Sequence, residues 1–125
     1  MHHKITQAEL DVMDVLWRES PLAASDVAER LSARKAWSAR TVKTLLSRLA
    51  EKGAVAHEPD GRRYLYRPLV SRARYAGKAA RTLVDRLFDG RAAPLVANLA
   101  ETGALTDEDI AELEALLEEL KRDGE

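Results

Sequence analysis

Cationic and hydroxyl side chains gather on one side of a predicted helix near the middle of the chain. Ser38 is a favourable N-terminal cap, and Gly53 suits the left-handed position that follows a helix end, so a helix is predicted between them. With about 100° per residue, the apolar residues of this helix share one buried face. These are Val42, Leu45, Leu46 and Leu49. The opposite face carries the set Ser38, Arg40, Thr41, Lys43, Thr44 and Arg48. It carries no acid before Glu51, and its groups can bond to phosphate oxygens and base edges.

Such a face fits the major groove of double-stranded DNA. A recognition helix brings its first turns against the base edges. Arg40 would then pair with a guanine or a phosphate, and threonine methyl groups would contact thymine methyl groups. Lys35, from the preceding loop, and Arg48 are expected to hold the backbone, which gives affinity but no sequence information. The alternative is an ordinary solvated helix face.

A β-hairpin is predicted directly after this helix. Residues 54–58 alternate with period two, Pro59-Asp60-Gly61 is typical of a turn, and residues 62–67 resume the alternation before a proline ends it. Arg62 and Arg63 open the second strand, where they could lie beside phosphates or in a minor groove. Tyr64 and Tyr66 share one face of that strand, which favours hydrophobic packing over base stacking.

The other elements are predicted to be helices. Thr6 and Glu9 form a capping box for a helix over residues 6–19, and a short helix follows at 24–31. Further helices are expected at 71–88, 94–101 and 106–120. The fold class is therefore mainly α with a small β-hairpin: a winged helix-turn-helix domain over residues 1–69 and a helical dimerisation region over 70–125.

The C-terminal helices carry apolar stripes that need a partner surface. The residues are Leu83, Leu87, Ile110, Leu113, Leu117 and Leu120. A homodimer would bury these stripes and would place two recognition helices about 34 Å apart, one turn of DNA. The alternative is that the C-terminal helices fold back on their own domain.

Charge is distributed unevenly, although the net charge is only −1. Residues 34–72 hold ten basic and three acidic side chains, a net of +7, whereas residues 101–125 hold two and ten, a net of −8. This asymmetry favours a polyanion-binding surface with a second surface kept away from it.

Several functional classes are not supported. The chain has no cysteine, no nucleophile–base constellation, no phosphate-binding glycine loop and no membrane-spanning apolar run, so we expect a cytoplasmic protein, not an enzyme, with no cofactor and no membrane insertion. His2 and His3 could be tag remnants, metal ligands or ordinary tail residues. One adjacent pair does not favour a metal site, and none is predicted.

The block Trp37-Ser38-Ala39-Arg40-Thr41-Val42, continuing through Lys43 to Gly53, resembles the penicillinase repressor family. That family includes the β-lactamase and methicillin-resistance repressors and the copper-operon repressors. The segments 5–13, 95–99 and 105–110 look like the same family, so the resemblance extends over about residues 5–122.

The resemblance implies a homodimeric transcriptional repressor, relevant to antibiotic resistance, that binds an inverted-repeat operator through its winged helix. It also implies a membrane sensor-protease system that triggers cleavage after an asparagine, here at the bond between Asn98 and Leu99, where the family pattern has phenylalanine in place of the leucine. Copper-type members use C-terminal cysteines, which this chain lacks.

Two other functions remain open on the sequence. One is a winged-helix regulator switched by a small ligand, which would need a pocket lined by Tyr66, Tyr75 and Phe88. The other is a winged helix used only for protein assembly, without DNA binding.

Overall fold

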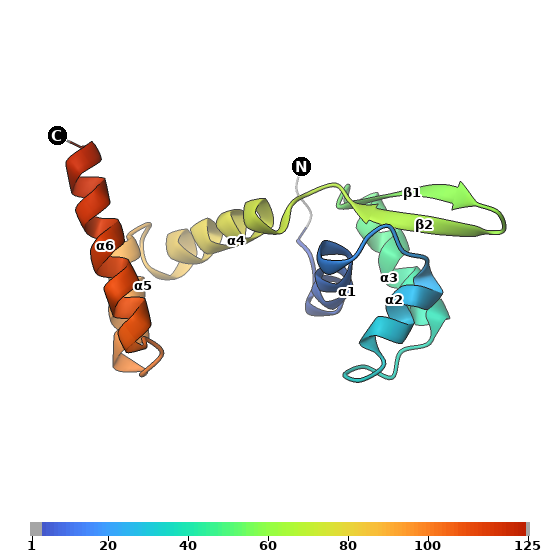
Figure 1. Cartoon of the computed structure of the whole chain (residues 1–125), viewed down its shortest axis with the longest axis horizontal. Helices are drawn as coiled ribbons and strands as arrows, with labels where there is room; N and C mark the ends of the chain where they lie inside the picture. Colours follow the sequence, from blue (N-terminus) through green and yellow to red (C-terminus); the bar gives the residue numbers. More distant parts are fainter. Residues whose placement is uncertain (1–3, 125) are drawn as a thin grey trace. The chain divides into compact units, whose positions relative to one another are not determined.

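Three helices and a hairpin form the N-terminal part of the chain in the computed structural model, which describes residues 4–124. The order is α1 (Gln7–Arg18), α2 (Ala24–Leu31), α3 (Ala39–Glu51), β1 (Val55–Asp60) and β2 (Arg63–Pro68) (Figure 1). Three helices remain: α4 (Arg72–Leu87), α5 (Ala92–Glu101) and α6 (Asp107–Asp123). The predicted fold class, mainly helical with a small antiparallel hairpin, is confirmed.

The chain divides into two compact units, Met1–Ala76 and Gly77–Glu125. The functions assigned to residues 1–69 and 70–125 stay a prediction. His2 and His3 lie outside the described residues.

Local signals start and stop the helices as predicted. The Thr6 hydroxyl accepts from the amide of Glu9 at 3.2 Å, and the Glu9 carboxylate accepts from the amide of Thr6 at 2.8 Å. Ser38 caps α3 by accepting from the amide of Thr41 at 3.2 Å. Gly53 follows α3 with φ +78°, a conformation that side chains with a Cβ rarely adopt. The capping box and the cap of α3 are confirmed.

The core of the first unit lies between α1, α2, α3 and the hairpin. The apolar face of α3 is buried there with residues from each of the other elements. Its main members are Val12, Met13, Leu16, Val27, Leu31, Val42, Leu45, Leu46, Leu49, Val55 and Tyr66. At roughly 1.5–3 kcal/mol per buried aliphatic side chain, this burial fixes which side of α3 faces outward.

The turn of the hairpin lies two residues later than predicted, because its central residues are Gly61 and Arg62 and not Pro59 and Asp60. Asp60 pairs with Arg63, so the two-residue loop is Gly61-Arg62, and Pro59 belongs to β1 opposite Tyr64. Gly61 has φ +67°, as the first central residue of a tight hairpin turn requires. In an antiparallel hairpin the residue pair next to a two-residue loop, here Asp60 and Arg63, is joined by two backbone hydrogen bonds. The next pair, Pro59 and Tyr64, is a non-hydrogen-bonded pair, so the missing amide hydrogen of proline leaves no hydrogen bond unmade. The Pro-Asp-Gly signal was therefore wrong in register, and Arg62 lies in the turn and not in the strand.

The hairpin is attached to the connection between α1 and α2 by backbone hydrogen bonds. The amide of Leu22 donates to the carbonyl of Tyr66 at 3.1 Å, and the amide of Tyr66 donates to the carbonyl of Leu22 at 2.8 Å. Tyr66 is only 5% exposed. The wing is therefore held at its base, while its tip stays exposed.

One charged side chain lies in the core. Glu9 is 1% exposed, and its Oε1 contacts the ammonium group of Lys52, which also donates to the carbonyl of Lys4 at 2.8 Å. Burial alone would raise the pKa of Glu9, but the Lys52 ammonium and the hydrogen bonds from Thr6 together hold that pKa below its ordinary value of 4.5. The ion pair joins the start of α1 to the end of α3.

The second unit buries much less. No residue of α4, α5 or α6 is buried, although all three helices are amphipathic. The helix starts predicted at residues 71 and 106 are confirmed by N-terminal caps: Ser71 Oγ accepts from the amide of Arg74 at 3.1 Å, and Thr106 Oγ1 accepts from the amide of Asp109 at 3.0 Å.

We predict that Lys52→Ala lowers the free energy of unfolding by about 3 kcal/mol at neutral pH, because it leaves the Glu9 carboxylate buried without a counter-charge. Urea unfolding followed by circular dichroism measures this. Lys43→Ala, an exposed lysine of the same helix, is the matched control and should change stability by less than about 0.5 kcal/mol.

The pair should also give the wild type a pH dependence. A lowered pKa in the folded state stabilises the fold above the unfolded-state pKa, and this contribution is lost as the pH falls through the folded-state value. Stability should therefore decline below about pH 4.5 more steeply in the wild type than in Lys52→Ala. Equal acid profiles would contradict the assignment.

Candidate nucleic-acid interface

The outer face of α3 is exposed. Burial of Val42, Leu45, Leu46 and Leu49 turns the polar side chains outward. The exposed set is Ser38, Arg40, Thr41, Lys43, Thr44 and Arg48. The structure thus brings these six predicted site residues together on one face, and Glu51 lies at the end of the helix, away from the first turns.

Hydrogen bonds within the face decide which groups remain available. Ser38 Oγ and Thr41 Oγ1 lie 3.2 Å apart, so the two hydroxyls bond to each other at the start of the helix. Thr44 Oγ1 donates to the carbonyl of Arg40 at 3.1 Å, which occupies its only hydroxyl proton. Thr44 therefore offers a methyl group and acceptor lone pairs to a ligand. Arg40 and Lys43 are the strong donors of these first turns.

The cations of α3 have no acidic partner. Within residues 4–124, no carboxylate lies within 4.0 Å of the charged groups of Arg40, Lys43 or Arg48. Lys35 differs, because its ammonium lies 3.9 Å from Asp11 and 5.7 Å from the centroid of the Trp37 ring. That half-exposed ion pair is weak, so it leaves Lys35 able to reach another anion.

The two arginines at the wing tip have different surroundings. Arg63 lies 3.3 Å from Asp60 in the hairpin and 3.8 Å from Asp26 in the first turn of α2. Arg62 has no carboxylate within 4.0 Å among the described residues. Sequence reasoning treated the two residues alike and missed Asp26, which is 37 positions away and gives no local signal. Arg62 is the cation that the tip presents without a partner, whereas Arg63 braces the wing.

The aromatic residues of the hairpin share one face, as predicted. The Tyr66 ring is in the core, while Tyr64 is 44% exposed and its ring centroid lies 4.7 Å from that of His57 in an edge-on arrangement. Packing under the wing is therefore confirmed for Tyr66, whereas Tyr64 is largely exposed and its ring contacts that of His57.

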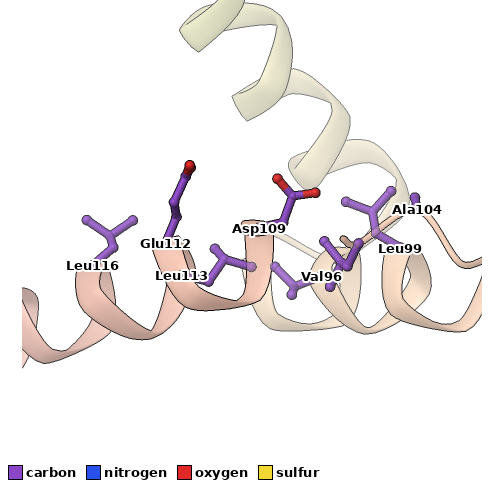
Figure 2. Close-up of a pocket in the computed structure, with 8 residues that line it drawn as sticks. Val96, Leu99, Ala104, Asp109, Glu112, Leu113 and Leu116 are labelled. Atoms are coloured by element: carbon purple, nitrogen blue, oxygen red, sulfur yellow. The ribbon is translucent and has the colours of Figure 1, made fainter. Parts of the chain in front are cut away.

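An apolar groove lies between α5 and α6 in the second unit. Figure 2 shows Val96 and Leu99 on α5 opposite Leu113 and Leu116 on α6, with Asp109 and Glu112 at the rim. The predicted dimerisation residues outside the groove are strongly exposed: Leu83 42%, Leu87 69%, Ile110 44%, Leu117 54% and Leu120 57%. Leu113 is half-buried.

The predicted cleavage bond is inside a helix. Asn98 and Leu99 lie in the last turns of α5, where their carbonyls accept from the amides of Thr102 at 3.1 Å and Ala104 at 3.0 Å. Leu99 also lines the groove.

Two other kinds of site are absent from the part of the chain that the structure describes. No group of three or more histidine, aspartate or glutamate side chains is arranged to hold a metal ion there. No helix within residues 4–124 is long and apolar enough to cross a membrane.

The element order, the exposed polar face of α3 and the anchored hairpin define a winged helix-turn-helix protein. A family model described as "Penicillinase repressor" matches residues 5–119. The chain belongs to the penicillinase repressor family, as the resemblance in the sequence indicated.

Curated relatives agree over nearly the whole chain. The penicillinase repressor of Bacillus licheniformis is 36% identical over 118 residues, which cover 94% of this chain and 92% of the relative. The methicillin resistance regulatory protein MecI of Staphylococcus aureus is 29% identical over 115 residues, which cover 92% and 94%.

Solved structures of the repressor BlaI match part of the chain. The DNA-binding domain of the repressor BlaI is 38% identical with a TM-score of 0.53, over 60% of this chain and 94% of that one. Monomeric BlaI of Bacillus licheniformis in complex with the blaP half-operator is 37% identical with a TM-score of 0.50, over 60% and 92%.

Proposed function

We propose that this protein is a transcriptional repressor that binds operator DNA through α3 and the wing. The observation that carries the proposal is the outer face of α3, where exposed cations without acidic partners stand beside threonine methyl and hydroxyl groups. Membership of a family of repressors and the likeness to a half-operator complex support it. Repression requires no chemistry on a substrate, so the protein is not an enzyme.

The geometry suggests a division of roles on the DNA. Arg40, Lys43 and Thr44 lie in the first turns of α3, where a recognition helix meets base edges, with Ser38 and Thr41 beside them at the cap. Lys35, Arg48 and Arg62 are placed to hold phosphates, and Arg63 contributes by keeping the wing in position.

A homodimer is the proposed active form. The helices α4, α5 and α6 bury no residue of their own, and their leucines form exposed apolar faces. Such faces are stabilised when a second copy covers them. The dimer would place two α3 helices in successive major grooves of an inverted repeat, about 34 Å apart.

Relief of repression by proteolysis is a further part of the proposal. A protease needs an extended chain, so α5 would have to unwind before the bond between Asn98 and Leu99 could be cut. A membrane sensor-protease system, acting on this repressor in the cytoplasm, is the trigger that the family resemblance suggests. A ligand pocket lined by Tyr66 finds less support, because that ring is buried in the core.

We predict that Arg40→Ala weakens binding to the preferred operator by about 1–3 kcal/mol while leaving binding to unrelated DNA nearly unchanged, because a bidentate contact to a guanine is lost. Fluorescence anisotropy with a duplex selected by this protein from a random pool measures it, at two salt concentrations. An equal loss on every duplex would reassign Arg40 to the backbone. No salt-dependent binding by the wild type would favour the protein-assembly function instead.

Arg62→Ala should reduce the slope of log affinity against log salt by about one unit, since one phosphate contact is lost. Arg63→Ala should reduce that slope less, because Asp26 and Asp60 already neutralise part of its charge. The same titration on both variants checks the order. A larger reduction for Arg63→Ala would contradict the assignment of Arg63 as the brace of the wing.

Leu117→Glu should shift the protein from dimer to monomer, raising the dimer dissociation constant at least about 100-fold, because each copy would bury a charge in place of a leucine. Sedimentation equilibrium measures this. Ala115→Glu adds the same charge on the opposite side of α6 and should leave the dimer intact. Equal dissociation of both variants would mean that this seam is not the interface.

A further inference from the structure

Trp17, near the end of α1, contacts the segment in which α4 begins. Its Nε1–H donates to the carbonyl of Val70 at 2.8 Å, and its ring centroid lies 5.7 Å from that of Tyr75. Val70 also packs on the core of the first unit. One side chain of α1 therefore contacts both the connection after β2 and the first turns of α4.

Arg72 adds a second set of contacts to the same place. Its guanidinium carbon lies 6.0 Å from the centroid of the Trp17 ring, and its Nη1 lies 3.9 Å from the carboxylate of Asp14, three residues before Trp17 on α1. We call Asp14, Trp17, Val70, Arg72 and Tyr75 the α4 clamp. It combines a hydrogen bond, an aromatic contact, a cation–π contact and an ion pair.

We propose that the α4 clamp fixes the first turns of α4 to the winged helix and so limits the movement of the connection that follows β2. Trp17 would be a positioning residue for operator binding, because α1 packs on α3 and its Trp17 and Asp14 contact Tyr75 and Arg72 in the first turn of α4. This inference rests on the proposed function, in which two winged helices joined by their C-terminal helices bind one inverted repeat. The clamp ends at Tyr75, next to the end of the first unit at Ala76.

The indole N–H is the informative part of the clamp. Packing alone would be satisfied by a phenylalanine ring, but only an N–H donor can bond to the Val70 carbonyl. Without that bond, the backbone of residues 69–71 has more rotational freedom. Binding of both recognition helices at a fixed spacing requires this freedom to be lost, which weakens binding to the full operator. Binding of a single winged helix to one arm of the operator demands no such ordering.

The size of the effect follows from one hydrogen bond per protomer. A net hydrogen bond corresponds to about a 5-fold change in an equilibrium constant. Because the dimer contains two clamps, the loss on a full operator should reach about 5- to 25-fold.

The experiment compares two duplexes: an inverted repeat selected by the wild-type protein from random DNA, and a duplex with only one arm of it. Trp17→Phe keeps the ring but removes the donor, and Arg72→Gln removes the cation. Arg81→Gln is the matched control, since Arg81 is an exposed arginine of α4 whose ion pair, 3.4 Å to Asp85, lies outside the clamp. Thermal melting verifies that each variant is folded.

We expect Trp17→Phe to bind one arm like the control but to bind the full repeat about 5- to 25-fold more weakly. Arg72→Gln should also bind one arm like the control and should lose less on the full repeat, because it removes an exposed ion pair and a cation–π contact but keeps the Trp17 hydrogen bond. Unchanged binding to both duplexes would overturn the proposal. An equal loss on both would also overturn it, because Trp17 would then support only the winged helix itself. A wild type that binds the full repeat no more tightly than one arm would contradict the dimeric repressor instead, which separates the two failures.

Amide hydrogen exchange tests the clamp without DNA. The amides of Arg74 and Tyr75 bond to Ser71 in the first turn of α4. Trp17→Phe should speed their exchange about 5-fold while leaving the amide of Leu46 in the core unchanged. Unchanged exchange at both α4 amides would overturn the proposal even if DNA binding failed for another reason.

Discussion

The amphipathic character of α3, with one buried apolar face and one exposed polar face, is the constraint on which the rest of the structure depends. Its aliphatic residues are buried between α1, α2 and the hairpin, so the helix has one stable orientation about its axis. That orientation turns Arg40, Lys43 and Thr44 outward. The capping serine fixes where the helix begins, and the ion pair between Glu9 and Lys52 ties its end to the start of α1. The proposed DNA contacts and the packing of the core therefore use opposite faces of the same thirteen residues.

Charge placement complements this arrangement. Three carboxylates near the basic segment lie beside particular cations: Asp11 is near Lys35, and Asp26 and Asp60 are near Arg63. The cations of α3 are left for an external anion. The acidic side chains of the chain are concentrated in α6, whose first turn alone holds Asp107, Glu108 and Asp109, where they complement the helix dipole. The same asymmetry that is visible in the sequence thus separates the proposed DNA-binding face from the proposed dimer seam.

Local signals predicted most of the fold, and contacts between distant residues account for what they missed. The caps at Thr6, Ser38 and Thr106 act within one helical turn, so the sequence alone indicates them. The hairpin turn was displaced by two residues because pairing along the whole strand outweighed the preference of proline for a turn. Trp17 and Lys52 bond to residues that lie 53 and 43 positions away in the sequence, and contacts over such distances produce no periodic pattern in the sequence. For the same reason the exposed face of α3 could be predicted, whereas the different surroundings of Arg62 and Arg63 could not.

The most direct test of the account is to map the DNA-bound surface by nuclear magnetic resonance. The ¹⁵N-labelled protein is titrated with its selected operator duplex, and the amide shifts of the first unit are followed. The largest changes should fall in residues 38–48 and 61–63, with little change in the buried face of α1. Changes centred on α1 or on the base of the hairpin, with α3 unaffected, would contradict the account.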